Sequence, residues 1–185
     1  MLNNATSPTV IRFGHSPDAD DAFMFYGLAK EIGTIPGCRI EHVMQDIQSL
    51  NRRAIEHGDL EITAISAAVY PRVAYRYRIM STGASIGRGY GPMLVRKHLG
   101  HPGQLSGRRI AIPGEQTTAF LLLRLYLGSD ANSVEFQPMH FERIPQAVLN
   151  GEVEAGLLIH EGQLTHSRLG LKCVADLGQW WEQET

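Results

Sequence analysis

The chain has 185 residues, 43% hydrophobic and 19% charged, with 17 basic against 19 acidic side chains and a formal net charge of −2. This apolar content is enough for a packed core and excludes a disordered chain, while the lack of a basic surplus argues against a nucleic-acid partner. The longest apolar runs fall far short of the ~20 residues that span a bilayer, and the first residues lack a signal-peptide pattern. We therefore predict a cytoplasmic chain with no membrane partner.

Strand-like and helix-like segments alternate along the chain. In chain order, the first half predicts a strand at Val10–Gly14, a helix at Asp21–Glu31, a strand at Arg39–Met44, a helix at Asp46–His57, a strand at Glu61–Ser66, a short helix interrupted by Pro71, and strands at Tyr77–Ile86 and Tyr90–Arg96. The second half predicts a strand at Arg109–Ile112, a helix at Thr117–Leu127, a strand at Val134–Met139, a helix at Ile144–Asn150 and a strand at Ala155–His160. This alternation indicates an α/β fold with mostly parallel sheets.

Two parts of the chain have the same order of motifs. The Ala-Phe pair at 22–23 recurs at 119–120, each time after a strand and a polar loop. The tetrapeptide GDLE at 58–61 is matched by GEVE at 151–154, each time before a predicted strand. The alternative explanation is a coincidence between two ordinary βαβ units. We interpret the pattern as an internal repeat.

The repeat predicts two similar lobes, residues 1–86 and 87–185, which face each other across a cleft and are joined near residues 84–92. In open parallel sheets, ligands bind beyond the carboxyl ends of the strands. Here the predicted strand ends carry small polar groups and imidazoles, which suit an anionic or hydroxylated small molecule. These residues are Gly14, His15, Ser16, Ser66, Pro113, Gly114, Thr117, Thr118 and His160.

The acidic run Asp18–Asp21 follows the first predicted strand and opens a helix. Carboxylates at a helix start accept hydrogen bonds from the free N–H groups of the first turn. A calcium-binding EF-hand would need a glycine and a terminal glutamate that this loop lacks. Helix capping is therefore the first interpretation of the run, and lining of the cleft is the second.

Thr117 and Thr118 lie at a predicted helix start, after a turn at Gly114. Hydroxyl groups together with free backbone N–H groups at a helix N-terminus bind anions. Threonine also caps helices well, and the two roles can coexist. We expect a carboxylate or a similar anion at this position.

His160 ends the apolar run AGLLIH, and Glu161 follows it. A lone histidine usually has a structural role, but this one ends a strand that faces the predicted cleft. An imidazole suits proton abstraction near neutral pH, so we predict a general base. If the strand continues, Glu161 points to its other side. His15 is the alternative base.

Motifs for metals and cofactors are missing from the sequence. The segment HEGQLTH lacks the HExxH spacing of a zinc site. The glycine-rich segment GRGYG lies between predicted strands and not before a helix, and neither a Walker loop nor a nucleophile elbow is present. Cys38 and Cys173 are too few for a disulfide framework or a cysteine-rich zinc site. We predict no metal and no cofactor.

Five segments together resemble the 1,4-dihydroxy-6-naphthoate synthase family of the futalosine route to menaquinone. They are, in order, SPDADDAFMFYGLA, GASIGRGYGPMLV, IAIPGEQTTAFLLLRLYL, GEVEAGLLIHEGQLT and LGQWWEQET, and the resemblance covers residues 10–185. It implies a two-lobed fold similar to type 2 periplasmic binding proteins. It also implies a cofactor-independent carbon–carbon lyase, whose small-molecule partner is the carboxylated substrate cyclic dehypoxanthine futalosine. Proton removal leads to elimination and carbon–carbon cleavage, and aromatisation of the second ring supplies the driving force.

The resemblance also implies roles for individual residues. The family's general base matches His160 in GLLIHE. The residues that match its substrate-binding positions are Thr117, Thr118 and Ser66, with Ser16 and Asp18 added from the matching SPDADDAF loop.

Family members continue past the WWEQET segment and return to complete the first lobe. The resemblance therefore implies that this chain is either truncated at Thr185 or a reduced homologue, with apolar patches of the first lobe left open. Two alternatives of the same fold stay open. One is a non-catalytic binding protein for carboxylates, and the other is the sibling enzyme chorismate dehydratase. The SPDADDAF and GLLIHE motifs favour the naphthoate synthase.

Overall fold

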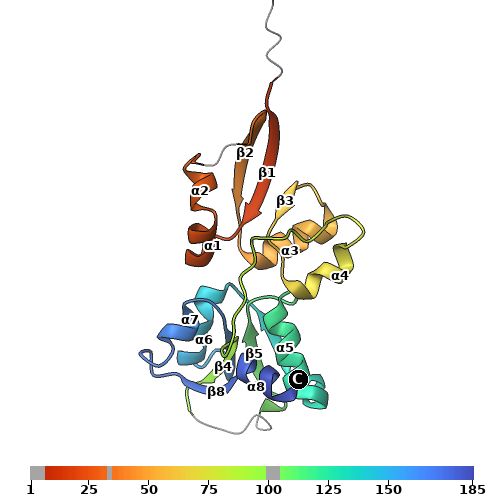
Figure 1. Cartoon of the computed structure of the whole chain (residues 1–185). Coiled ribbons are helices and arrows are strands. Elements are labelled where there is room, and N and C mark those ends of the chain that lie inside the picture. The colour runs from red at the N-terminus through yellow and green to blue at the C-terminus, as the bar shows by residue number, and fades with distance from the viewer. Residues whose placement is uncertain (1–6, 33–34, 99–104) are drawn as a thin grey trace, which may run out of the picture. The chain divides into compact units, whose positions relative to one another are not determined.

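The computed structural model describes residues 7–32, 35–98 and 105–185. The chain divides into two compact units, unit 1 (Met1–Ser85) and unit 2 (Ile86–Thr185). Each unit has its own sheet with helices packed against it (Figure 1). No helix in the described part of the chain is long and apolar enough to cross a membrane.

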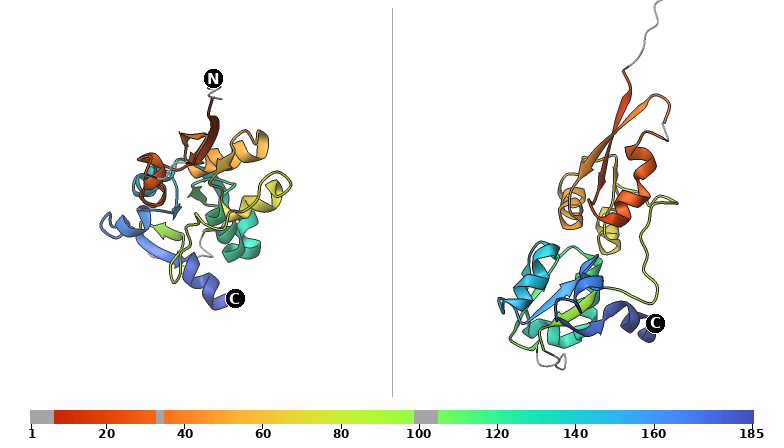
Figure 2. Two further views of the ribbon diagram at one scale, coloured as in Figure 1. Left: turned by 45° about the horizontal axis from the view of Figure 1, so that its top comes forward. Right: turned by 90° about the vertical axis from the view of Figure 1, so that its left-hand side faces the viewer.

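Unit 1 contains a three-stranded parallel sheet in the order β2-β1-β3. The strand β1 (Thr9–His15) pairs along its whole length with β2 (Cys38–Met44) and, near its end, with the two-residue strand β3 (Ile62–Thr63). Two short helices, α1 (Ala19–Met24) and α2 (Tyr26–Ala29), lie along one side of the β1–β2 pair (Figure 2). The other helices of this unit are α3 (Ile47–Glu56), η1 (Ala67–Val69) and α4 (Tyr70–Val73).

Three predictions for unit 1 need correction. The helix predicted at Asp21–Glu31 is divided into α1 and α2, because Phe25 between them leaves the helical conformation. The strand predicted at Glu61–Ser66 pairs only over Ile62–Thr63. The strand predicted at Tyr77–Ile86 is wrong, since this segment forms neither helix nor strand. The backbone N–H and C=O groups of a strand need hydrogen-bond partners on a neighbouring strand, and an alternating sequence pattern does not show whether such a neighbour exists.

Unit 2 contains a five-stranded sheet in the order β6-β5-β7-β4-β8. Its strands are β4 (Met93–Arg96), β5 (Arg109–Ile112), β6 (Glu135–Pro138), β7 (Ala155–Leu158) and β8 (Lys172–Asp176). The strand β5 is parallel to β6 and β7, whereas β4 is antiparallel to β7 and β8. The expectation of mostly parallel sheets is therefore confirmed for unit 1 and for only three strands of unit 2. The sequence analysis missed β8 and the helix α8 (Leu177–Glu184).

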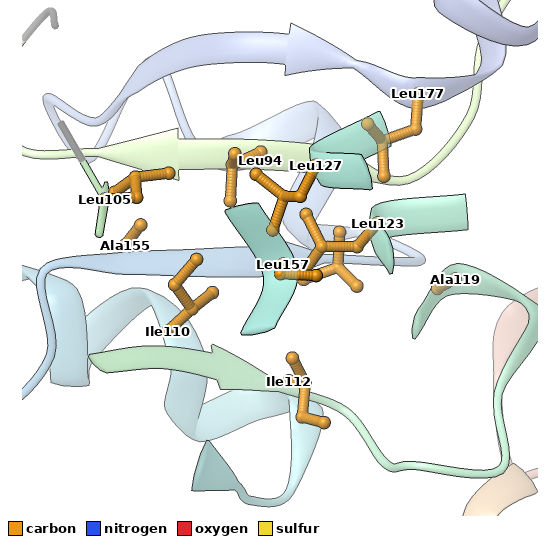
Figure 3. Packing of buried hydrophobic residues seen from close by; sticks show 11 residues of the cluster. Leu94, Leu105, Ile110, Ile112, Ala119, Leu123, Leu127, Ala155, Leu157 and Leu177 are labelled. Carbon is orange, nitrogen blue, oxygen red and sulfur yellow. The ribbon is translucent and has the colours of Figure 1, made fainter. Parts of the chain in front are cut away.

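Helices cover both faces of the unit 2 sheet. The helix α5 (Thr118–Leu127) packs on a cluster that includes Ile110 and Ile112 (Figure 3). The helix α6 (Ile144–Leu149) packs on a second cluster with Ala111, because successive residues of a strand point to opposite faces. The close approach of α6 depends on Gly156, where a Cβ atom would lie 2.5 Å from the side chain of Ile144. The remaining helices are η3 (Gly128–Ser133), η4 (Phe141–Arg143) and α7 (Gly162–Thr165).

The internal repeat corresponds to a shared topology. In both β2-β1-β3 and β6-β5-β7, the first strand of the unit's repeat lies between the second and the third. Gly58 and Gly151 both have a positive φ, +61° and +75°, just after α3 and α6, a conformation that favours glycine. The repeated phenylalanines differ, since Phe120 packs against the unit 2 core whereas Phe23 is 87% exposed.

Candidate functional site

In unit 2, three parallel strands end at the same edge of the sheet. The chain leaves β5 into the turn before Thr117, leaves β6 toward Phe141 in η4, and leaves β7 toward His160. The structure therefore brings the predicted anion-binding threonines and the predicted base to one sheet edge. The sequence analysis missed Phe141, and only its position after the predicted strand Val134–Met139 could have indicated it.

Thr117 is a buried helix cap. Its Oγ1 accepts a hydrogen bond from Phe120 N (3.1 Å) and donates one to Gly114 O (2.8 Å). The only hydroxyl hydrogen of Thr117 is thus used inside the protein. The half-buried Thr118, the first residue of α5, is the better candidate of the two for direct contact with a ligand.

His160 lies in a turn and not in a strand. The strand β7 ends at Leu158, so the prediction of a strand that reaches His160 is wrong, and the argument from alternation about Glu161 no longer applies. His160 has a φ of +51°, a left-handed conformation that is uncommon for residues other than glycine and is often found at functional sites. Its ring makes an edge contact with Phe141 at a centroid distance of 5.2 Å.

Ser16 and Asp18 lie together in unit 1, just beyond the end of β1, and both are buried. Ser16 Oγ donates to the Asp18 carboxylate, and Ser16 N donates to Asp21 Oδ2 (2.7 Å). Asp18 occupies the N-cap position of α1, but its side chain makes no capping hydrogen bond, so the capping interpretation is wrong for this side chain. Burial raises the pKa of the Asp21 carboxyl, and the hydrogen bond from Ser16 N only partly offsets this effect.

Ser66, the N-cap residue of η1, is held by Asn51 of α3. Ser66 N donates to Asn51 Oδ1 (2.8 Å), and Asn51 Nδ2 donates to Ser66 Oγ (2.9 Å). Because Asn51 uses Ser66 Oγ as an acceptor, the hydroxyl hydrogen of Ser66 remains for donation to another group. The sequence analysis missed Asn51. Its position between Leu50 and Ala54, on the buried face of an amphipathic helix, was the available signal.

His15, the alternative base, has both ring nitrogens engaged. Its Nδ1 lies 2.9 Å from Ser16 O, and its Nε2 lies 2.9 Å from His42 Nδ1. His15 as a whole residue is only 6% exposed. To accept a proton from a substrate, His15 would have to release one of these partners.

Comparisons with known sequences identify close relatives. The chain is 42% identical over 175 residues to a 1,4-dihydroxy-6-naphtoate synthase of Thermus thermophilus, and 35% identical over 182 residues to a protein of the same name from Streptomyces coelicolor. The two alignments cover 95% and 97% of this chain. The chain spans 61% and 63% of the lengths of these two relatives.

Solved structures show the same fold. A crystal structure of a protein from Archaeoglobus fulgidus is 50% identical, with a TM-score of 0.87, and the match covers 95% of this chain and 63% of that one. The alkanesulfonate-binding protein of Xanthomonas axonopodis pv. citri, bound to MOPS, is 14% identical, with a TM-score of 0.67 over 93% of this chain and 62% of that one. The latter likeness confirms the expectation of a periplasmic-binding-protein-like fold. A family model described as menaquinone biosynthesis matches residues 11–185, and the chain therefore belongs to this menaquinone biosynthesis family.

Proposed function

We propose that this chain catalyses the conversion of cyclic dehypoxanthine futalosine to 1,4-dihydroxy-6-naphthoate, a carbon–carbon lyase step of menaquinone biosynthesis. Membership of the family and the names of the two curated relatives support the proposal. The observation that carries it is the common sheet edge in unit 2, where Thr118 opens α5 after β5 and His160 follows β7. Paired parallel strands give such groups a rigid spacing, as a base and a carboxylate anchor require.

His160 acts as the general base in this proposal. A ring nitrogen accepts a proton from a substrate carbon, and the electron pair that is left behind drives elimination and cleavage of a carbon–carbon bond. The sugar-derived piece leaves, and the second ring becomes aromatic. Electrons are conserved within the substrate, so the step needs no oxidant or reductant, and we propose that no metal or cofactor takes part. The contact with Phe141 keeps the imidazole oriented during the transfer.

Unit 1 contributes substrate-binding groups in this proposal. Ser66 donates its hydroxyl hydrogen to the anionic part of the substrate, because Asn51 already satisfies its oxygen. The buried carboxylate of Asp18 would repel an anion. It therefore orients Ser16, to which it is hydrogen-bonded, or accepts from a hydroxyl group of the sugar-derived ring.

The test is incubation of the chain with cyclic dehypoxanthine futalosine, followed by mass detection of the naphthoate. We expect product without any added cofactor, the same turnover after treatment with EDTA, and no reaction with chorismate. Binding without product would instead support a non-catalytic binding protein, and dehydration of chorismate would support the sibling enzyme. A loss of activity with EDTA that a divalent ion restores would contradict the proposal of a metal-free reaction.

A further inference from the structure

A pair of histidines lies on one face of the unit 1 sheet. His15 Nε2 and His42 Nδ1 are 2.9 Å apart, and the two rings are nearly perpendicular, at 84°. Alternate residues of a strand share a face, so Phe13 lies beside His15, and Phe13 is also the register partner of His42 in β2. Phe25 packs against both Phe13 and His15, with centroid distances of 4.5 and 5.4 Å. Phe13 therefore contacts both histidines, and Phe25 contacts His15.

The hydrogen bonds around this pair determine which nitrogens carry protons. Ser16 O can only accept a hydrogen bond, so His15 Nδ1, at 2.9 Å, must donate to it. A neutral His15 then presents Nε2 as an acceptor, and His42 Nδ1 must donate to that nitrogen. The two hydrogen bonds thus run in the same direction: His42 in β2 donates to His15, and His15 donates to the backbone carbonyl of Ser16.

Ser16 is the point at which this chain of hydrogen bonds reaches the predicted substrate-binding residues. Its N–H is held by Asp21, its hydroxyl by Asp18 and its carbonyl by His15. We propose that His42 is a positioning residue, which acts through His15 to hold Ser16 and Asp18 in the geometry used for the substrate. The last part of this inference rests on the proposed function, whereas the hydrogen-bonded arrangement itself does not.

The charged groups near the pair are carboxylates. Asp18 and Asp21 lie in the turn after β1 and in α1. On the strands themselves, Arg12 and Glu41 are register partners at the alternate positions, so they face the other side of the sheet. Burial and the neighbouring His15 lower the pKa of His42, and this effect exceeds the opposite influence of the Leu28 backbone in α2. Burial therefore favours the neutral form of His42, which can donate from Nδ1 to His15.

The first test measures the protonation sites directly. The imidazole nitrogens of the whole chain are labelled with ¹⁵N, and the tautomer of each histidine is read from nitrogen chemical shifts at a pH above neutrality. We expect the Nδ1–H tautomer for both His15 and His42, whereas free imidazoles favour the Nε2–H form. An Nε2–H tautomer at either residue would overturn the inference.

The second test compares two variants of His42 by amide hydrogen exchange. His42→Phe keeps a ring beside Phe13 but removes the donor, whereas His42→Asn keeps an N–H close to the position of Nδ1. In His42→Phe we expect the Ser16 amide to exchange about fivefold faster, the effect of one net hydrogen bond, and the Ile11 amide farther along β1 to change little. In His42→Asn both amides should keep wild-type rates. Equal acceleration of both amides, or of neither, in His42→Phe would show a merely structural role and overturn the inference.

A substitute variant and a control complete the hydrogen-exchange experiment. If His42→Phe does not fold, His42→Gln replaces it, because its amide reaches farther and cannot place a donor at Nδ1. The Ser16 amide should then exchange faster in His42→Gln than in His42→Asn, and equal rates would overturn the inference. His57→Asn, at an exposed histidine of the same unit, is the control and should leave the Ser16 amide unchanged.

Turnover separates this inference from the proposed function. If the wild type forms the naphthoate, His42→Phe should raise KM about fivefold with a smaller change in kcat, and His42→Asn should restore the wild-type KM. A lower kcat with an unchanged KM would overturn the role in substrate positioning. If the wild type is inactive, the proposed function fails, while the tautomers and exchange rates still decide whether His42 positions the Ser16 turn.

Discussion

Asn51 and Ser66 form a closed pair, in which the buried amide of α3 accepts from the Ser66 N–H and donates to the Ser66 hydroxyl oxygen. Asn51→Leu fills a similar volume but removes both hydrogen bonds and leaves polar groups of Ser66 without these partners. We expect the free energy of unfolding to fall by about 1–3 kcal/mol, measured by urea denaturation. Ser66→Ala removes only the hydroxyl group and should have a smaller effect. Wild-type stability of Asn51→Leu would contradict the importance of this pair.

Replacement of His160 tests the proposed base. His160→Asn keeps a polar side chain but cannot accept a proton near neutral pH, and asparagine adopts left-handed backbone conformations more readily than most residues. The variant should therefore fold normally. Its turnover should fall at least ~10²-fold while the affinity for substrate changes little, as measured by steady-state kinetics and by equilibrium binding. Normal turnover would place the base elsewhere.

The two threonines at the start of α5 should respond differently to replacement by valine. Thr117→Val removes the cap on Phe120 N and the bond to Gly114 O, so it should lower the free energy of unfolding by about 1–2 kcal/mol. Thr118→Val should weaken substrate binding by roughly 1.5–3 kcal/mol, the contribution of a hydrogen bond to a charged group. Thermal unfolding and calorimetric binding measure the two effects. Equal substrate affinity of Thr118→Val and the wild type would refute the anion site.

Acid should destabilise unit 1 through His42. The pKa of His42 is lowered in the folded state, mainly by burial, so the unfolded chain binds a proton more readily. The contribution of neutral His42 to the free energy of unfolding is complete above the unfolded-state pKa of about 6.5. This contribution is lost as the pH falls from that value through the lower pKa of the folded state. We expect the Tm of the wild type to decrease more steeply than that of His42→Asn between pH ~7.5 and ~5. Parallel decreases would show that other groups control the acid sensitivity.

Local patterns in the sequence predicted most elements that have a strong hydrophobic period or a clear end signal. The helix α3, with Asp46 as its cap and Gly58 after its end, and the buried strand β5 both lie where they were expected. The internal repeat predicted two units with the same order of elements, and the structure adds that β2-β1-β3 and β6-β5-β7 share a strand order. These features depend on residues close together in the chain, and this is why a sequence pattern can reveal them.

Other features depended on contacts between distant residues. The partner of a strand decides whether it forms, so the segment at 77–86 did not become a strand, whereas β8 formed against β4. The same holds for the candidate site. The sequence identified Ser66, Thr117 and His160 by type and position. Only the folded chain showed that Asn51 is hydrogen-bonded to Ser66 and that the Thr117 hydroxyl donates to Gly114 O. It also showed that the ring of Phe141 contacts that of His160. A hydrogen bond or ring contact needs both partners placed within a few ångströms, and tertiary packing alone sets that distance.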